Sequence, residues 1–223
     1  MLILPKNTKI TVVGDIHEHS NHFFKLLNQI KPNKNNILIS IGDIYGKGYG
    51  EIEAEKITKK LIEMNKEGIA FAVRGNHEQG RLSNQKSECL NWFSTCPYSL
   101  PIRFSNQSQV LIIHAGVTPH FTDYDLQHNI QCLYLRNIDN KGNFIPINKK
   151  ETGKPWHKYY DGRFGYIISG HDSQGDGIPK FYSYSCNIDT RCYETGKLTA
   201  IVYGENGREE IITINDKPAR RKQ

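Results

Sequence analysis

The chain has 223 residues, of which 37% are hydrophobic, and a formal net charge of +6 at pH 7. This length suits one domain with a substantial core, and no apolar run approaches the roughly 20 residues that a membrane-spanning helix needs. A membrane partner is therefore not expected, whereas the positive charge favours anionic partners such as phosphorylated molecules or nucleic acid.

The two ends and the cysteines add further limits. The first residues lack the basic region and the small-residue cleavage site of a signal peptide, so we expect a cytoplasmic protein. The five cysteines are odd in number and form no Cys-x-x-Cys motif, which predicts reduced thiols. We expect one domain over residues 1–216 and a disordered basic tail over residues 217–223, which has little to bury. Nucleic acid is a conceivable partner of this tail, but we favour a solubilising end.

The first predicted strand covers residues 10–13, which are mostly β-branched, and it ends in Gly14-Asp15-Ile16-His17. Apolar residues at helical spacing then predict a helix over residues 20–30, capped by Ser20 or Asn21. A second apolar run, residues 37–41, leads into Gly42-Asp43 and a glycine-rich loop. Another amphipathic helix follows through residues 54–64, with Gly68 as its expected stop.

The third strand, residues 69–73, leads into Asn76 and His77, which completes a βαβαβ pattern. This pattern predicts an α/β protein with a mostly parallel sheet and helices on its faces. Two later strands, residues 110–113 and 166–168, lead into His114 and into Gly170-His171. The alternating segments 198–203 and 209–214, joined by a turn at residues 204–207, predict an antiparallel hairpin.

Each of the five strands before the hairpin ends in a residue that can bind a metal ion. The set offers carboxylate, amide and imidazole ligands without thiolates, which suits manganese, iron, zinc or magnesium. Six such ligands are too many for one catalytic ion that keeps an open position, so they predict two ions. A metal pair clamps phosphoryl oxygens and lowers the pKa of a bridging water, which points to phosphoester hydrolysis.

These motifs also resemble a known family. Gly14-Asp15-Ile16-His17, Gly42-Asp43, Gly75-Asn76-His77-Glu78, His114-Ala115-Gly116 and Gly170-His171 resemble the calcineurin-like metallophosphoesterase superfamily. The segments 74–78 and 114–117 are similar to its phosphoprotein phosphatase branch, which includes bacterial serine/threonine phosphatases and symmetrical diadenosine tetraphosphatases. The resemblance spans residues 13 to about 200 and implies a four-layer α/β/β/α sandwich of mixed sheets with helices on the outer faces.

The resemblance also implies the roles of single residues. Two divalent ions are expected, manganese first, with iron, zinc or magnesium as alternatives. The first ion would be bound by Asp15 and His17, Asp43 would bridge, and the second would be bound by Asn76, His114 and His171. His77 would be the general acid, and Lys47 and Arg136 would hold the substrate phosphate.

The second motif departs from the usual Gly-Asp-x-x-Asp-Arg-Gly of the branch. Gly46 replaces the aspartate that would partner His77, and Lys47 replaces the arginine. We expect a gap at Gly46, so that Gly46→Asp would restore the partner, unless another carboxylate such as Asp172 already serves His77. Arg191 replaces a glycine and either adds charge near the site or points to solvent.

Three functional hypotheses follow. The favoured one is a serine/threonine-type protein phosphatase that acts on phosphomonoesters. The second is a hydrolase of dinucleoside polyphosphates, such as diadenosine tetraphosphate, or of nucleic-acid ends. The third is a catalytically weak metal- and phosphate-binding module. The partner would thus be a phosphorylated protein or a nucleotide, with specificity in the loops of residues 79–109 and 140–160. The sequence leaves the oligomeric state open.

Overall fold

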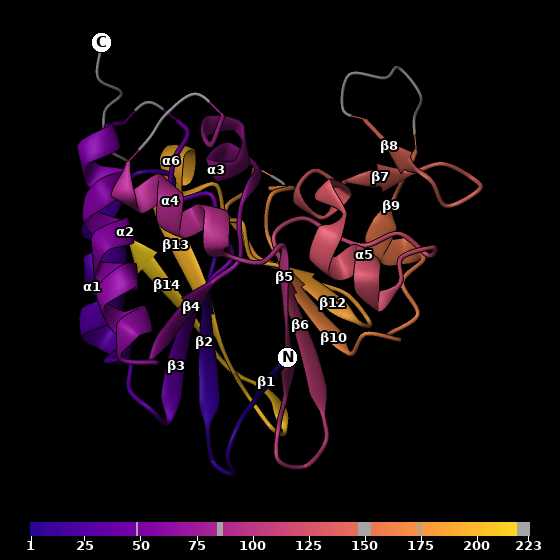
Figure 1. The fold of residues 1–223 in the computed structure, drawn as a ribbon, viewed down its shortest axis with the longest axis horizontal. Helices are drawn as coiled ribbons and strands as arrows, with labels where there is room; N and C mark the ends of the chain where they lie inside the picture. Colours follow the sequence, from indigo (N-terminus) through magenta and orange to yellow (C-terminus); the bar gives the residue numbers. More distant parts are fainter. Residues whose placement is uncertain (48, 84–86, 147–152, 174, 218–223) are drawn as a thin grey trace.

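The computed structural model of the chain describes residues 1–47, 49–83, 87–146, 153–173 and 175–217 (Figure 1). Its first large sheet contains, in spatial order, β14 (Gly207–Asn215), β13 (Lys197–Gly204), β2 (Lys9–Val13), β3 (Asn36–Ser40) and β4 (Ala70–Ala72). Strands β2, β3 and β4 are parallel, as the predicted βαβαβ pattern requires. The predicted hairpin is confirmed as β13 and β14, and β13 joins the sheet antiparallel to β2.

The second large sheet contains β1 (Leu2–Ile3), β5 (Ser99–Arg103), β6 (Gln109–Ile113), β10 (Tyr166–Ser169), β12 (Ser185–Asn187) and β11 (Lys180–Phe181), in this spatial order. Strands β6, β10 and β12 are parallel to one another. Strand β5 is antiparallel to β6 but parallel to β1, and β11 is antiparallel to β12. The five predicted strand ends are therefore divided between two sheets. A small third sheet consists of β8 (Phe144–Ile145), β7 (Asn137–Ile138) and β9 (Lys154–Pro155).

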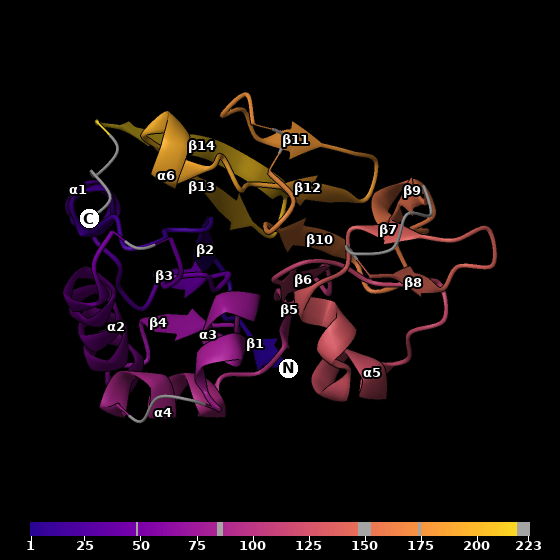
Figure 2. The same cartoon turned by 90° about the horizontal axis from the view of Figure 1, so that it is seen from above.

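Helices cover the outer faces of the two large sheets, which confirms the four-layer α/β/β/α arrangement (Figure 2). The first sheet is covered by α1 (Ser20–Ile30), α2 (Glu51–Lys66) and α4 (Glu88–Thr95). On the second sheet lie α5 (Asp123–His128) and the 3₁₀ turns η1 (Ile130–Leu133) and η2 (Trp156–Lys158). Two short helices, α3 (Asn76–Arg81) and α6 (Cys192–Thr195), lie at one end of the molecule, at the top of Figure 1.

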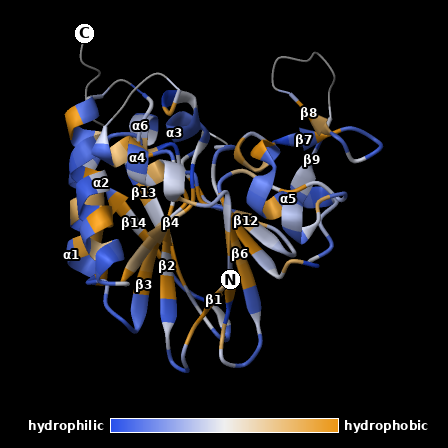
Figure 3. Cartoon of the chain, viewed as in Figure 1, coloured by the Kyte–Doolittle hydropathy of each residue, from blue (hydrophilic) through white to orange (hydrophobic). Residues whose placement is uncertain are grey.

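The core has three parts because the strands bury both of their faces. Ile10 and Val12 of β2 point between the two sheets, where they pack with residues such as Ile112 and Ile168. Val13 points the other way, toward α1 and α2. This alternation follows from the two-residue period of a strand. Figure 3 shows the hydrophobic residues gathered on the strands and on the helix faces that cover them.

Two local predictions can be compared with the structure. Gly68 has a φ of +70°, and its N–H donates to the carbonyl of Asn65, so the expected end of α2 is confirmed. The predicted cap of α1 is wrong, because the N-cap is His19 and no side chain caps the helix. Ser20 instead lies inside α1 and donates from its hydroxyl to Glu53.

Among the residues described, no helix is both long and apolar enough to cross a membrane. Most of the predicted tail, residues 218–223, lies outside the described residues, as do Gly48 and parts of the two loops expected to set specificity, residues 84–86 and 147–152. The cytoplasmic location and the role of the tail stay predictions.

Candidate active site

The predicted ligands follow strands of both large sheets and meet at one edge of the sandwich. Asp15 and His17 follow β2, and Asp43 follows β3 in the same sheet. His114 and His171 follow the parallel strands β6 and β10 of the other sheet. Ligands bind outside the carboxyl ends of parallel strands. A polar cavity of about 150 Å³ lies there, lined by Asp15, His17, Asp43, Lys47, Asn76, His77, Arg136, His171, Ser173, Asp189, Arg191 and Tyr193.

Asp43 is shared by two groups of potential metal ligands. Its ligand atoms lie within 4.8 Å of those of His17 and His77 on one side and of His114 and His171 on the other. Oδ2 of Asp43 is 3.7 Å from Nε2 of His17, whereas Oδ1 is 3.4 Å from Nε2 of His114. One carboxylate therefore faces two sets of histidines, which is the geometry that a bridging ligand needs.

Backbone carbonyls set the orientation of two of these histidines. Nδ1 of His17 is 2.8 Å from the carbonyl oxygen of Tyr45, and Nδ1 of His114 is 2.8 Å from that of Ile41. Because a carbonyl can only accept, each Nδ1 carries the proton and donates it. In the neutral rings, the lone pair of Nε2 would then be available to a cation bound beside Asp43, as in histidine ligands whose second nitrogen is held by the protein.

Asn76 and Arg136 hold the second group together. Oδ1 of Asn76 is 3.0 Å from Nε2 of His114 and 2.9 Å from Nδ1 of His171. On the other side of the His171 ring, Nε of Arg136 donates to Nε2 at 3.3 Å, and Nη2 donates to the backbone oxygen at 3.2 Å. The His171 ring is therefore contacted both by Asn76, which was predicted as a metal ligand, and by Arg136, which was predicted as a phosphate contact.

Buried negative charge indicates that this donor set fits cations. Within the described structure, Oδ2 of Asp15 is buried without a hydrogen-bond partner. Burial and the neighbouring Asp189 raise the pKa of the Asp15 carboxyl well above its usual range, and burial raises the pKa of Asp189 to about 6. Together with Asp43, these residues place three carboxylates in one cavity. Bound divalent cations would relieve their repulsion and satisfy the oxygen of Asp15.

The three predicted or suspected cationic residues all line the cavity. Nζ of Lys47 lies 4.5 Å from the ring centroid of Tyr193, and Nε of Arg191 donates to the Tyr193 hydroxyl at 3.0 Å. The Tyr193 ring also meets the His17 ring edge-on, with centroids 5.1 Å apart. Arg191 therefore belongs to the cavity wall, and Tyr193 links both cations of this wall to the candidate metal ligands.

The sequence also matches a known protein family. The model of the calcineurin-like phosphoesterases matches residues 8–204. The chain belongs to this family. Since the match includes every predicted ligand, the phosphoesterase fold and the hydrolase class are established, and members of the family depend on two metal ions.

Several relatives of this phosphoesterase have curated names. The bis(5'-nucleosyl)-tetraphosphatase PrpE [asymmetrical] of Oceanobacillus iheyensis is 27% identical over 92% of each chain. The symmetrical bis(5'-nucleosyl)-tetraphosphatase of Wigglesworthia glossinidia brevipalpis is 28% identical over 65% of this chain and 60% of its own. The serine/threonine-protein phosphatase 6 catalytic subunit of Caenorhabditis elegans is 28% identical over 55% of this chain and 40% of its own.

A solved structure has the same fold. A crystal structure described as that of a candidate diadenosine tetraphosphatase superimposes with a TM-score of 0.75 over 96% of both chains, at 22% sequence identity. At this identity the likeness supports the fold of the phosphoesterase and leaves its substrate open.

The loops that carry three of the predicted ligands have strained backbone conformations. His17, Asp43 and His171 have φ angles of 45°, 53° and 67°, where residues other than glycine are rare. Such conformations cost about 1–3 kcal/mol each and persist only when the surroundings enforce them. One source of enforcement is the buried carboxylate of Glu78, which accepts the backbone N–H groups of Asp43, Ile44, Tyr45 and Gly75 at 2.8–3.1 Å.

The predicted gap beside His77 does not exist. The backbone N–H of His77 donates to Oδ1 of Asp43 at 3.0 Å, and the imidazole ring of His77 lies against Gly46. A Cβ atom on Gly46 would be 2.0 Å from Nδ1 of His77, so Gly46→Asp cannot restore a partner without moving the ring. The alternative partner Asp172 lies 3.6 Å from Nε of Arg136. The prediction was wrong because it treated glycine as a missing side chain rather than as room for the histidine.

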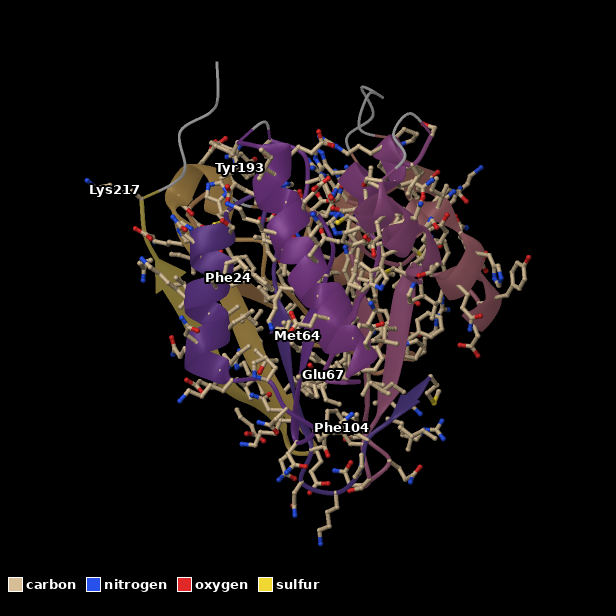
Figure 4. All side chains as sticks on the ribbon, turned by 60° about the vertical axis from the view of Figure 1, so that its left-hand side comes forward. Phe24, Met64, Glu67, Phe104, Tyr193 and Lys217 are labelled. Carbon is tan, nitrogen blue, oxygen red and sulfur yellow. The ribbon has the colours of Figure 1, made fainter. Side chains whose placement is uncertain are left out.

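Three residues of the site region, Asp189, Tyr193 and Glu78, had no role predicted from the sequence. Asp189 follows β12 by two residues and thus lies beyond the carboxyl end of its strand, as the predicted ligands do, but a strand of three residues was too short to recognise. Tyr193 carries no signal of this kind, since it belongs to the short helix α6. In Figure 4 it lies beside that helix, at the end of the molecule opposite Phe104.

Proposed function

We propose that the chain is a dinuclear-metal-dependent hydrolase that splits phosphoanhydride bonds in dinucleoside polyphosphates. The observation that carries this proposal is the presence of three cationic side chains, Lys47, Arg136 and Arg191, in the wall of one small cavity. A phosphomonoester presents a single phosphoryl group to the metal ions and a basic pair. A third cation beside them suits a chain of several phosphates.

We assign the predicted ligands to the two ions. Asp15 and His17 would hold the first ion, and Asn76, His114 and His171 the second, with Asp43 between them. The oxygen and imidazole donors suit manganese, and iron, zinc or magnesium as alternatives. When bound, such a pair clamps phosphoryl oxygens and supplies hydroxide from a bridging water near neutral pH. We treat residues 1–216 as the catalytic domain.

The other residues of the cavity would bind and orient the substrate. Arg136, whose guanidinium is fixed by its bonds to His171, would hold phosphoryl oxygens with its planar fork. Lys47, in place of the usual arginine, would contribute a point charge from the Tyr193 side. Both groups stabilise charge that develops on the phosphoryl oxygens as the bond to the leaving group breaks.

His77 would donate a proton to the leaving oxygen. Nε2 of His77 is 3.9 Å from Oδ2 of Asp43, so the ring faces the ligand cluster. Its Nδ1 faces Gly46 rather than the carboxylate usual in the phosphatase branch. Acid catalysis matters most for basic leaving groups. A phosphate leaving group needs less help than a serine alkoxide, which also favours anhydride substrates.

Serine/threonine phosphatase activity, favoured by the sequence analysis, becomes the second candidate. The match to the protein phosphatase 6 subunit supports it but covers 55% of this chain, whereas the PrpE match covers 92%. The remaining hypothesis, a catalytically weak module, predicts metal and phosphate binding without efficient turnover.

The substrate class can be tested directly. The purified full chain with Mn²⁺ is given diadenosine tetraphosphate, a phosphoserine peptide and p-nitrophenyl phosphate, and kcat/KM is measured for each. An Asp15→Asn protein, purified in parallel, controls for contaminating phosphatases. We expect the largest kcat/KM for diadenosine tetraphosphate, and p-nitrophenyl phosphate to be preferred over the peptide. A peptide preference would favour the second candidate, and slow turnover of all three by the metal-loaded protein would favour the weak module.

A further inference from the structure

A second cavity, of about 540 Å³, adjoins the metal-ligand cavity. Asn76, Arg136 and His171 line both cavities, so they share a wall. The remaining lining residues are Ile130, Gln131, Tyr134, Phe144 and Pro146. The volume falls within the roughly 300–1,000 Å³ typical of small-molecule sites, and a largely apolar lining with a few polar groups is also typical of them.

The turn that forms one side of this cavity has apolar residues on two faces. Cys132 and Leu133 are fully buried in the protein, but Ile130 is 46% exposed and Tyr134 is 37% exposed. Ile130 and Tyr134 line the second cavity, whereas Cys132 packs in the core beside β6. Apolar side chains gathered at the edge of a polar catalytic cavity mark a ligand surface rather than a folding requirement.

We propose that this second cavity binds one of the two nucleosides of the substrate. It is the nucleoside whose 5′ phosphoryl group lies at the metal-ligand cluster. The inference rests on the proposed function. A nucleobase has flat apolar faces that can stack on aromatic rings, here Tyr134 and Phe144. Its polar edges need hydrogen-bond partners, and Gln131 supplies an amide with both donors and an acceptor. A phosphoserine peptide has no flat ring at this distance from its phosphate.

The shared wall also selects the bond that breaks. With the nucleoside in the second cavity, its α-phosphorus is the first to reach the ligand cluster. The oxygen of water bonds to the α-phosphorus, and the bond from that atom to the oxygen bridging to the β-phosphorus breaks. The departing oxygen receives a proton from His77, and the proton that the water loses is released to solvent, from which His77 is protonated again. Diadenosine tetraphosphate and water thereby give AMP and ATP. The departing phosphates extend toward Lys47 and Arg191, on the Tyr193 side of the metal-ligand cavity.

Substitutions at Tyr134 test the base contact. The substrates are diadenosine tetraphosphate and inorganic tripolyphosphate, an anhydride without a nucleoside. Stacking of a base on an aromatic ring is worth about 1–3 kcal/mol, which corresponds to a loss of about 5- to 150-fold for Tyr134→Ala on diadenosine tetraphosphate. The loss on tripolyphosphate should be at least fivefold smaller, and Tyr134→Phe should restore activity. The matched control is Tyr159→Ala, because Tyr159 is 39% exposed and lines a different cavity. This variant should hydrolyse both substrates as fast as the wild type does.

Two measurements complement the kinetics. Calorimetry with AMP and the Mn²⁺-loaded protein should show binding that weakens in Tyr134→Ala but not in Tyr134→Phe. Hydrolysis in ¹⁸O-labelled water should place the label in AMP. Equal losses on the two substrates, an equal loss on a phosphoserine peptide, or ADP as the product would overturn the proposal. If the wild-type protein binds AMP through Tyr134 but does not hydrolyse diadenosine tetraphosphate, the proposed function fails while the nucleoside site stands.

Discussion

A Cβ atom on Gly46 would lie 2.0 Å from Nδ1 of His77, so the histidine ring occupies the space that any larger residue at position 46 would need. Gly46 also has a φ of +120°, which side chains rarely adopt. We therefore expect both Gly46→Ala and Gly46→Asp to lower turnover, by about 100-fold if the ring moves by 1 Å. Turnover on diadenosine tetraphosphate, metal content and the melting temperature would be measured together.

Gly80→Ala is the matched control for this substitution. A Cβ on Gly80 meets nothing within 4 Å, and the residue lies in helix α3. Alanine there should leave turnover unchanged and stabilise the protein by about 0.5–1 kcal/mol. An increase in turnover with Gly46→Asp would contradict the steric argument and support the partner that the sequence analysis expected.

Asp43→Asn should lower turnover by at least about 100-fold, a far larger effect than its effect on the stability of the fold. Asp43 faces both histidine groups, so its charge fixes the spacing of the two ions and contributes to the several kcal/mol that such a site supplies. In chelator, the variant should be less stable than the wild type near neutral pH. Although burial opposes it, His114 and His17 lower the pKa of the Asp43 carboxyl, so its charge favours the folded protein. Near-normal turnover in a folded Asp43→Asn protein would refute the bridging role.

Arg191→Gly should weaken the hydrolysis of long phosphate chains more than that of small esters. Arg191 has a φ of 57°, which glycine adopts without strain, so the fold should tolerate the change. A charge-assisted hydrogen bond is worth about 1.5–3 kcal/mol, which predicts a loss of at least about tenfold in kcat/KM for diadenosine tetraphosphate. The loss on p-nitrophenyl phosphate should be below about threefold.

Arg208→Ala controls for net charge. It removes the same charge from an exposed position, where the guanidinium lies 4.0 Å from the ring centroid of Phe181. This variant should hydrolyse both substrates as the wild type does. Equal effects of the two arginine substitutions would show that Arg191 acts through the overall charge rather than through contact with the substrate.

The five cysteines should be reduced and unreactive in the folded protein. All five are buried, and burial raises the pKa of Cys96, Cys132 and Cys186 to about 12. Since the thiolate is the reactive form, a thiol reagent at pH 8 should react slowly with the native protein and reach five equivalents in denaturant. Fewer than five reactive thiols in the unfolded protein would reveal a disulfide. Rapid reaction of the thiols in the native protein would show that the core opens easily.

The sequence by itself determined the local elements and the residues at their ends. The β-branched run before Asp15, the helical spacing in residues 20–30 and the left-handed glycine at position 68 depend on neighbours in the chain, so periodicity and turn chemistry predict them. The order of the strand-end motifs was enough to indicate the family. The same motifs, through the resemblance that they carry, named the predicted ligands and the two predicted cations, Lys47 and Arg136.

Only the tertiary structure decided how these local features meet. Placing β6 and β10 in a second sheet brought His114 and His171 to Asp43, and packing put Tyr193 against Lys47 and set the ring of His77 on Gly46. The second cavity likewise arises where the turn at residues 130–134 comes beside Asn76 and His171. Contacts between segments far apart in the chain depend on side-chain packing in three dimensions, and no local pattern records them.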